Sequence, residues 1–449
     1  MNSISPVDSA LKDYYSALSL VCENIAPYCL DPVANFTRKR KLTPDKLITF
    51  LTSMQGKAMN SEICDFFPED VPTASAVHQA RKKLLPEAMR RMLLLFNRSC
   101  SDNGMTFKGW NILACDGSAV NIPYNPEDTD TLCIYGFDKK EYNQIHLNAL
   151  YDSLNGIFYD CSIDSCHKAG ECKALQKMIQ DHNYPEKSII TADRGFENYE
   201  LIAHCQRADQ KFLFRVKDIT SNGLLKNLNL NGSEMDIQVS RILTRLQTTE
   251  VKNHPELYRH LPWKQSFSFM PPGGATEYPI HFRAVRVQLS EDTWECLVTN
   301  LTPDEFSSAE LKALYHLRWN EEVAFRRLKY SVDMISFHSK NRRFIEQEIY
   351  GALLAHNLTC RMIQKTDETC MKKEADSHEH QGRIRKQKHP RKANFSAAVT
   401  NLRKLLRGEI DSREMEKRIK KYLIPIRPDR KYGRDVKPKS AKGFLYRAS

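Results

Sequence analysis

The 449-residue sequence predicts an α/β protein with a mixed sheet, preceded by a helical region and interrupted by a β-rich segment. Three patterns predict this class. Apolar residues recur at helical spacing up to about residue 105. Extended and helical segments then alternate between 106 and 217. Extended segments dominate 218–305 before helical spacing returns. The composition, 41% hydrophobic and 27% charged, excludes a collagen, a coiled coil and a wholly disordered chain.

Residues 1–105 form the helical region. Segments 59–67 and 75–96 are expected to be two helices around a turn, with Thr73 and Ser75 as candidate N-caps, which is typical of a helix-turn-helix. We therefore interpret this region as DNA-binding, and the alternative is a helical bundle with a solvated basic face. The side chains expected to point outward from the second helix are His78, Gln79, Arg81, Lys82 and Lys83.

Residues 106–217 are expected to form the first part of the sheet. Strands are predicted at residues 111–120, 144–152 and 156–163, with the turn signal Leu154-Asn155-Gly156 before the third. A helix, a strand, a second helix and another strand follow, at residues 170–182, 188–196, 198–206 and 211–217. This order predicts a mixed sheet covered by helices.

The β-rich insertion, residues 218–305, has extended patterns at 266–270, 280–289 and 294–301. Helical spacing returns in 306–366, first from Ser307 to Lys329 and then at about 346–363. The region 367–449 is expected to be a linker and a basic C-terminal region, because residues 365–395 are polar and poor in apolar side chains.

The positive charge is concentrated near the C-terminus. Residues 376–449 hold 22 Lys+Arg and 8 Asp+Glu, a net +14, whereas the first 375 residues hold 45 and 47, a net −2. Such a basic segment indicates contact with a polyanion such as nucleic acid, and the alternative is a solvated face. Apolar spacing in residues 395–406 also suggests docking on the body or on a second subunit.

No apolar run is long enough to span a membrane, and the first residues lack the pattern of a signal peptide, so we expect a cytoplasmic protein. The 13 cysteines are then expected to be reduced. One group, Cys161, Cys166, His167 and Cys172, has the spacing C-x4-C-H-x4-C, which is not a usual zinc pattern, and we do not predict zinc there.

Two aspartates follow apolar strand patterns. Asp116 lies in LACDGSAV and Asp193 in IITADRGF. Carboxylates at strand ends of an α/β sheet lie where ligands usually bind, although a single Asp there is more often a turn former. Two aspartates on strands of one sheet favour a ligand-binding site.

The helix from Ser307 to Lys329 should begin with a capping box of Ser307 and Glu310. At about 100° per residue, four polar side chains fall within about 60° of arc. The alternative to a functional face is an i,i+4 salt-bridge face between Arg318 and Glu322. The four polar side chains are those of Tyr315, Arg318, Glu322 and Lys329. The opposite, buried stripe of the helix is expected to consist of Ala313, Leu314, Leu317, Ala324, Phe325 and Leu328.

The spacing Tyr315-x2-Arg318-x3-Glu322-x6-Lys329 resembles the Y-x2-R-x3-E-x6-K signature of bacterial DDE transposases of the "insertion sequence four" group. Other blocks are also similar to that family, over about residues 105–365: Trp319 after the Arg, Asp116 in DGS, Asp193 in ADRG, and LVTNL before the signature helix. The resemblance implies a ribonuclease H-like core with a β-rich insertion between the second Asp and the Glu.

The resemblance also implies a site. Asp116, Asp193 and Glu322 would be the catalytic residues and the ligands of Mg²⁺, with Mn²⁺ as a substitute, because two divalent ions about 3.5–4 Å apart activate water and stabilise a leaving oxygen. Glu321 is the rival for Glu322, but it points about 100° away. The residues expected to contact DNA are Tyr315, Arg318, Trp319, Lys329 and Arg194.

The implied function is a cut-and-paste DNA transposase. It would bind terminal inverted repeats of double-stranded DNA, cleave at the transposon ends and join the 3′ ends to target DNA, as a homodimer in the synaptic complex. The alternatives are a ribonuclease H-like DNA nuclease without strand transfer, and a non-catalytic DNA-binding regulator derived from a transposase. In related hairpin-forming transposases an insertion-domain aromatic stacks on a flipped base. Trp263 and Trp294 lie in the insertion here, the sequence assigns this role to neither, and core packing is favoured for Trp294.

Overall fold

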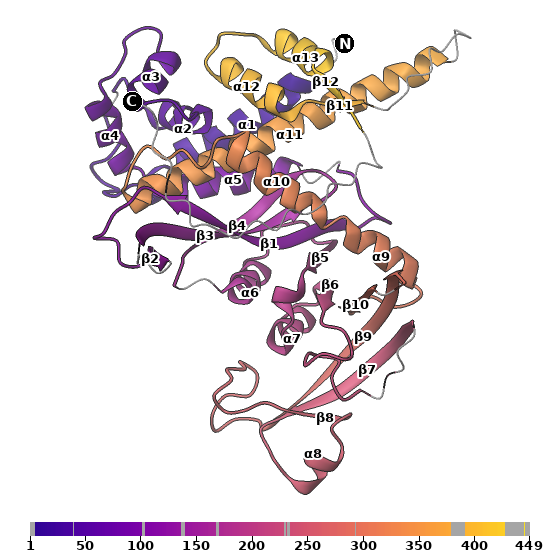
Figure 1. Ribbon diagram of the computed structural model, residues 1–449. Helices are drawn as coiled ribbons and strands as arrows, with labels where there is room; N and C mark the ends of the chain where they lie inside the picture. Colours follow the sequence, from indigo (N-terminus) through magenta and orange to yellow (C-terminus); the bar gives the residue numbers. More distant parts are fainter. Residues whose placement is uncertain are drawn as a thin grey trace.

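The computed structural model describes residues 5–426 and Phe444, apart from Lys39, Asn229, Asp292 and the segments 101–103, 136–139, 168–169, 231–233 and 379–390. A long sheet runs through the molecule, with the N-terminal and C-terminal helices packed on one face of its upper part and α6 (Glu171–Asp181) and α7 (Tyr199–Arg207) on the other (Figure 1). The predicted α/β class with a mixed sheet is confirmed.

The N-terminal region is helical, as predicted. Its elements are α1 (Pro6–Glu23), a 3₁₀ turn (Ala26–Tyr28), α2 (Pro44–Ser53), α3 (Met59–Phe66), α4 (Ala74–Lys83) and α5 (Pro86–Cys100). Thr73 caps α4, since its side chain accepts a hydrogen bond from the Ala76 amide at 3.2 Å. The sequence favoured one helix over residues 75–96, but the chain turns at Leu84 and Leu85, because a residue before proline disfavours helical geometry.

The prediction that Arg81 points outward is wrong. Val77, Ala80 and Arg81 are buried on one face of α4, and Leu84 continues it, which is the i, i+3, i+4, i+7 pattern of a packed helix. The Arg81 side chain is only 1% exposed, so it lies inside the molecule and not on a DNA-facing surface. His78, Gln79 and Lys82 are exposed and Lys83 is half-buried.

The core sheet has the strand order β4-β3-β1-β5-β6. β1, β3 and β4 are antiparallel neighbours, and β5 and β6 continue the sheet parallel to β1. The short strand β2 was missed, because four residues are too few for a clear alternation. The elements of this part are β1 (Asn111–Ile122), β2 (Leu132–Tyr135), β3 (Lys140–Asp152), β4 (Ile157–Ser165), α6 (Glu171–Asp181), β5 (Ser188–Ala192), α7 (Tyr199–Arg207) and β6 (Lys211–Val216).

The insertion after β6 is β-rich, as predicted, and it extends the same sheet. β10 pairs with β6 antiparallel, and β9 and β7 follow outward, reaching the lower end of the view in Figure 1. Residues 266–270, where an extended pattern was expected, contain no strand. The elements are β7 (Met235–Thr244), α8 (Thr249–Asn253), β8 (Tyr258–His260), β9 (Glu277–Ser290) and β10 (Thr293–Thr299).

The helices after the insertion return to the core. They are α9 (Ser308–His316), α10 (Trp319–Tyr330) and the long α11 (Arg342–His378). α11 runs well into the segment 365–395 that was expected to be a flexible linker, so that expectation is wrong up to His378, and residues 379–390 lie outside the described part.

The C-terminal region folds back on the body. β11 (Arg391–Ala393) leads into α12 (Phe395–Leu406), and α13 (Ser412–Lys421) is followed by β12 (Leu423–Pro425). The Phe395 ring lies 5.0 Å from the His356 ring of α11, and Val399 and Leu402 are buried. The expected docking of residues 395–406 therefore takes place within this chain.

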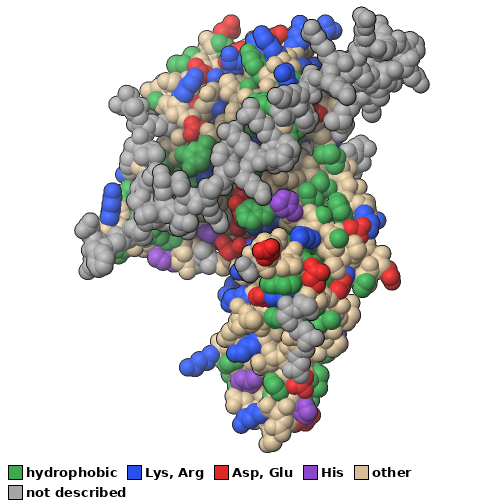
Figure 2. Space-filling model, turned by 45° about the vertical axis from the view of Figure 1, so that its right-hand side comes forward, with side chains coloured by type: hydrophobic (Ala, Val, Ile, Leu, Met, Phe, Trp, Pro, Cys, Tyr) green, Lys and Arg blue, Asp and Glu red, His purple; other side chains and the backbone are tan. Residues whose placement is uncertain are grey.

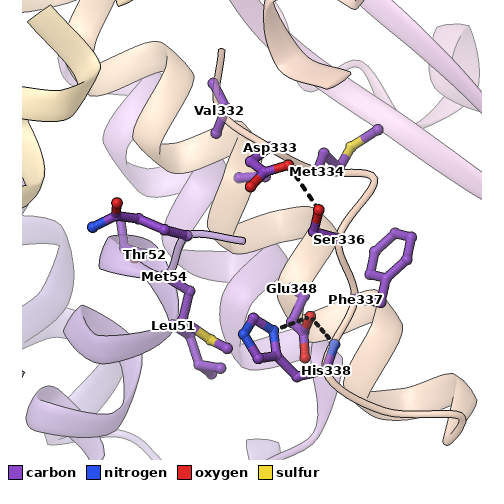
Figure 3. Close-up of a pocket in the computed structure, with 12 residues that line it drawn as sticks. Leu51, Thr52, Met54, Val332, Asp333, Met334, Ser336, Phe337, His338 and Glu348 are labelled. Atoms are coloured by element: carbon purple, nitrogen blue, oxygen red, sulfur yellow. Dashed lines mark hydrogen bonds and ion pairs between the residues drawn. The ribbon is translucent and has the colours of Figure 1, made fainter. Parts of the chain in front are cut away.

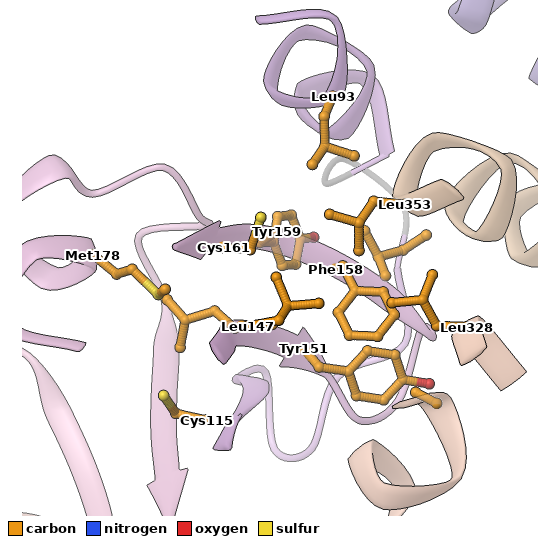
Figure 4. Close-up of a cluster of buried hydrophobic side chains, with 14 of the residues drawn as sticks. Leu93, Cys115, Leu147, Tyr151, Phe158, Tyr159, Cys161, Met178, Leu328 and Leu353 are labelled. Atoms are coloured by element: carbon orange, nitrogen blue, oxygen red, sulfur yellow. The ribbon is translucent and has the colours of Figure 1, made fainter. Parts of the chain in front are cut away.

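The main hydrophobic core joins the sheet to the helices that cover it. In Figure 4, Leu93 of α5, Leu328 of α10 and Leu353 of α11 lie around Phe158 of β4, and all four are buried. Cys115 of β1 belongs to the same cluster, so the strand that carries Asp116 is anchored in the core. None of the helices in the described part is both long and apolar enough to cross a membrane.

A buried charge network ties α4 to α11. The Arg81 guanidinium donates to Glu348 Oε1 at 2.8 Å and to the Phe344 carbonyl at 3.0 Å. The other Glu348 oxygen, Oε2, lies 3.0 Å from Nδ1 of His338 and accepts from the His338 amide (Figure 3). Burial raises the pKa of Glu348, but Arg81 and His338 outweigh it and bring the pKa to about 2.

We predict that Glu348→Ala lowers the free energy of unfolding by about 3–5 kcal/mol, because it leaves the Arg81 charge buried and unpaired. The folded-state pKa is depressed below the ordinary 4.5. The wild type therefore holds its full advantage above pH 4.5 and loses it as the pH falls towards about 2. Urea unfolding between pH 7 and pH 3 measures both effects.

Glu346→Ala is the matched control, since Glu346 forms a half-exposed i,i+4 pair with Arg342 on the same helix. Glu346→Ala should lower the free energy of unfolding by less than about 1 kcal/mol. Equal losses in the two variants would contradict the importance of the buried network.

Candidate catalytic site

Asp116 and Asp193 lie side by side on neighbouring parallel strands. The β1–β5 register ends with Cys115 opposite Ala192, and each Asp is the next residue. Asp193 follows β5 directly, and its Oδ1 accepts from the Gly195 amide at 2.7 Å. Asp116 lies in the middle of β1 and not at a strand end, because β1 continues antiparallel to β3 as far as Ile122. The parallel pairing nonetheless ends at the two aspartates, as ligand sites in such sheets require.

The predicted helix from Ser307 to Lys329 is two helices. The capping box of Ser307 and Glu310 is confirmed, but α9 ends at His316 and α10 begins at Trp319. Between them, the amides of Leu317 and Arg318 bond to carbonyls three residues back, at 3.1 Å each. These 3₁₀-type bonds turn the chain more tightly than an α-helix does.

The tighter turn changes which side chains face the core. Ala313 is exposed, so the expected stripe is wrong at this position. Leu314, Ala324, Phe325 and Leu328 are buried, and the half-buried Leu317 packs against the apolar cluster that contains Leu314. Tyr315 is 1% exposed and packs in a second apolar cluster, and its side chain therefore does not share an open face with Glu322.

Arg318 links the carboxylates of the strand and the helix. Its Nη1 lies 3.6 Å from Asp116 Oδ2, and its Nη2 lies 3.6 Å from Glu322 Oε1. The side chain is buried, with 3% exposed, and within the described residues its Nε and Nη1 have no hydrogen-bond partner. A buried guanidinium with unsatisfied donors is suited to an anion such as a phosphate group.

Glu321 and Glu322 occupy different environments. Glu322 is 37% exposed and faces the Arg318 side of the site. Glu321 is fully buried beside Asp116, and burial, followed by the Asp116 charge, raises its pKa well above the usual value. Neither Glu321 oxygen has a hydrogen-bond partner among the described residues. Only Glu322 is placed to meet a ligand that arrives from solvent.

The other expected DNA contacts are spread around this centre. Trp319 is 40% exposed, and its ring lies 5.1 Å from the Arg318 guanidinium. Lys329 Nζ donates to the Ala119 carbonyl at 2.7 Å, three residues along β1 from Asp116. Arg194 is exposed next to Asp193. In the insertion, Trp263 is exposed, whereas Trp294 packs under the Arg286 guanidinium at 3.9 Å.

Two residues of the site were missed in the sequence. His146 Nε2 and Glu171 Oε1 are 3.1 Å apart. A Cβ at Gly117 would collide with both side chains, and one at Gly195 would lie 3.2 Å from Glu171 Oε2. The pair therefore fills the space between the two aspartate blocks. An acidic residue at the start of helix α6 was the available signal, but it also fits an ordinary helix start.

The site is rich in acidic groups. Burial raises the pKa of Asp116 to about 6, Arg318 and the Gly117 amide oppose the rise, and Asp193 and Glu171 add to it. Figure 2 shows Asp and Glu side chains gathered near the middle of one face, with Lys and Arg beside them. Hard carboxylate oxygens fit a divalent cation. In the described residues, Asp116, Asp193 and Glu322 do not form a group whose ligand atoms all lie within 4.8 Å of one another.

Comparisons with known proteins point to one family. A family model described as "Transposase DDE domain" matches residues 109–358, the part that carries Asp116, Asp193 and Glu322. The chain is 25% identical over 298 residues to the transposase InsG for insertion sequence element IS4 of Escherichia coli (strain K12). That alignment covers 63% of this chain and spans only 60% of the relative's length.

A solved structure, the cryo-EM piggyBac transposase synaptic complex with hairpin DNA, aligns with 95% of this chain and 87% of its own, at a TM-score of 0.44 and 10% identity. The family model alone covers more than half of the 449 residues. The chain therefore belongs to the DDE transposase family, of the bacterial type that includes the IS4 enzyme.

Proposed function

We propose that this protein is a DNA transposase that binds the terminal inverted repeats of its element, cleaves there and joins the freed 3′ ends to target DNA. The observation that carries the proposal is the convergence of Asp116 and Asp193, on adjacent parallel strands, with Glu322, through the shared Arg318. A binding module has no need for such a convergence of carboxylates, which argues against a non-catalytic regulator.

DDE transposase domains generally use divalent metal ions. Asp116, Asp193 and Glu322 would hold Mg²⁺, or Mn²⁺ in its place, and the ions would supply water activation and stabilisation of the leaving 3′ oxygen. Burial, with smaller contributions from Asp193 and Glu171, raises the pKa of Asp116, and a bound cation would favour its ionised form, which supports this assignment.

The cationic residues would position the DNA. Arg318 would offer its two unsatisfied donors, Nε and Nη1, to a phosphate at the scissile bond. Lys329 would add a point charge on the β1 side, and exposed Arg194 and Trp319 would contact the flanking strand. Buried Tyr315 lies with its ring 5.7 Å from the Arg318 guanidinium, so we assign it to holding Arg318 and not to direct phosphate contact.

Transposition requires two DNA ends to be held together, so we propose a homodimer in the synaptic complex. A nuclease with the same residues would cleave without joining. Incubating the protein with labelled end DNA and a supercoiled target separates these functions: a transposase yields end DNA covalently joined to target, and a nuclease yields cleaved ends alone.

A first prediction from the proposed function concerns the carboxylates. Asp116→Asn, Asp193→Asn and Glu322→Gln should each lower end cleavage by more than about 10³-fold and leave end binding within about threefold, since ligands of one metal centre act as a unit. Gel shift and cleavage on a single labelled end measure both.

Glu321→Gln is the matched control for Glu322→Gln. Burial raises the pKa of Glu321 well above its usual value, which favours the neutral acid that an amide imitates, so cleavage by Glu321→Gln should stay within about tenfold of wild type. Loss of cleavage in Glu321→Gln with retention in Glu322→Gln would reverse the assignment.

A second prediction concerns Gly117. A methyl group there would displace His146 and Glu171, and the charge of Glu171 acts on the neighbouring Asp116. Gly117→Ala should therefore lower cleavage by about 100-fold, because small displacements of reacting groups cost rates of that order. Ser118→Ala, at the next position, adds no atom and should cleave normally. Normal cleavage by Gly117→Ala would show that the close packing around Gly117 is irrelevant to the reaction.

A third prediction concerns α13, where Arg413, Lys417 and Lys421 are exposed at four-residue spacing and form one basic face. If this face contacts phosphates, the triple change to Gln should weaken specific and random DNA alike and reduce the slope of log affinity against log salt by up to about 2.7. Fluorescence anisotropy at several salt concentrations gives the slope. An unchanged slope with an unchanged melting temperature would exclude the contact.

A further inference from the structure

Strands β2 and β4 lie end to end along one edge of β3. β2 pairs with the first residues of β3, from Tyr135 opposite Lys140 to Leu132 opposite Asn143. β4 pairs with the rest, and its last residue, Ser165, lies opposite Ile145. The end of β4 therefore meets the start of β2 at a junction where neither strand continues.

Three metal-ligating side chains meet at this junction. One ligand atom each from Cys133, Cys166 and His167 lies within 4.8 Å of the others, and within the described ranges this is the one such group of three or more His, Cys, Asp or Glu residues. It differs from the group singled out in the sequence. Cys161 is buried in β4, and Cys172 faces the Gly195 carbonyl at 3.6 Å. Cys133, which lies 33 residues before Cys166 in the sequence, takes the place of Cys161 and Cys172 in the observed cluster.

The junction is held in place by the chain that leads into β2. Buried Asn143 bonds through its amide group to Asn125, to the Asp128 carbonyl at 3.2 Å and to the Thr131 hydroxyl at 2.9 Å. Carbonyl groups of this fixed segment accept hydrogen bonds from the side chains of the cluster. Cys166 faces the Asp130 carbonyl, and His167 Nε2 lies 2.7 Å from the Leu132 carbonyl.

We propose that Cys133, Cys166 and His167 form a zinc site, separate from the catalytic carboxylates, that joins the start of β2 to the end of β4. Two thiolates and an imidazole select a borderline-soft ion such as Zn²⁺ over Mg²⁺. The Leu132 carbonyl can receive the second ring N–H of His167, an arrangement that orients zinc-bound histidines. Water completes the tetrahedron, and the two thiols release their protons on binding.

The test is metal content and spectroscopy of the full-length protein, purified under reducing conditions. We expect about one zinc per chain after dialysis against excess Mg²⁺. Replacement by Co²⁺ should give a thiolate-to-cobalt charge-transfer band and tetrahedral d–d bands in the visible. Cys133→Ser, Cys166→Ser and His167→Gln should each weaken zinc binding by more than about 100-fold, since loss of a supporting partner alone costs about 10–100-fold.

Cys172→Ser is the control, because it removes a neighbouring thiol outside the cluster and should retain zinc. His167 is exposed, so His167→Gln should fold even if the cysteine variants do not, and its far-UV circular dichroism verifies this. The proposal is overturned if the wild type binds no zinc at micromolar concentration, if Cys172→Ser loses zinc equally, or if mass spectrometry finds a Cys133–Cys166 disulfide with no metal.

Discussion

The parallel pairing of β1 with β5 is the constraint on which the site depends. It ends at Cys115 and Ala192, and it therefore places two carboxylates next to each other where the backbone ladder stops. Such an arrangement is electrostatically unfavourable without a counter-charge, and Arg318 supplies one from the helical layer. The strand pairing and the position of α10 therefore depend on each other.

The position of α10 depends in turn on the packing behind it. Ala324, Phe325 and Leu328 bury one face of α10 against the core, and the tight turn at Leu317 and Arg318 directs Arg318 inward. The same helical layer contains α11, which is bound to α4 through Arg81 and Glu348. The helical N-terminal region and the sheet that carries Asp116 are thus connected through one helical layer.

Features set by local sequence could be predicted. The capping box at Ser307, the strand before Asp193 and the helices after β4 and β5 follow from periodicity and cap chemistry alone. Features set by contacts between separate helices and strands could not. Arg81 looked like a surface cation because Glu348, its partner, is 267 residues away. His146 meets Glu171 only because helix α6 packs on β3, and Cys133 meets Cys166 only through the register of β2 and β4 on β3, and the sequence pattern shows neither arrangement.

The central claim is that Asp116, Asp193 and Glu322 bind one set of divalent ions. Iron-mediated cleavage of the protein backbone tests it most directly, since Fe²⁺ occupying a Mg²⁺ site generates hydroxyl radicals that cut the chain beside its ligands. With the Cys133 cluster protected by zinc, ascorbate and peroxide should cut near residues 116, 193 and 322, and excess Mg²⁺ should suppress all three cuts together. Cuts at only one of these positions, or cuts that Mg²⁺ does not suppress, would contradict a shared site.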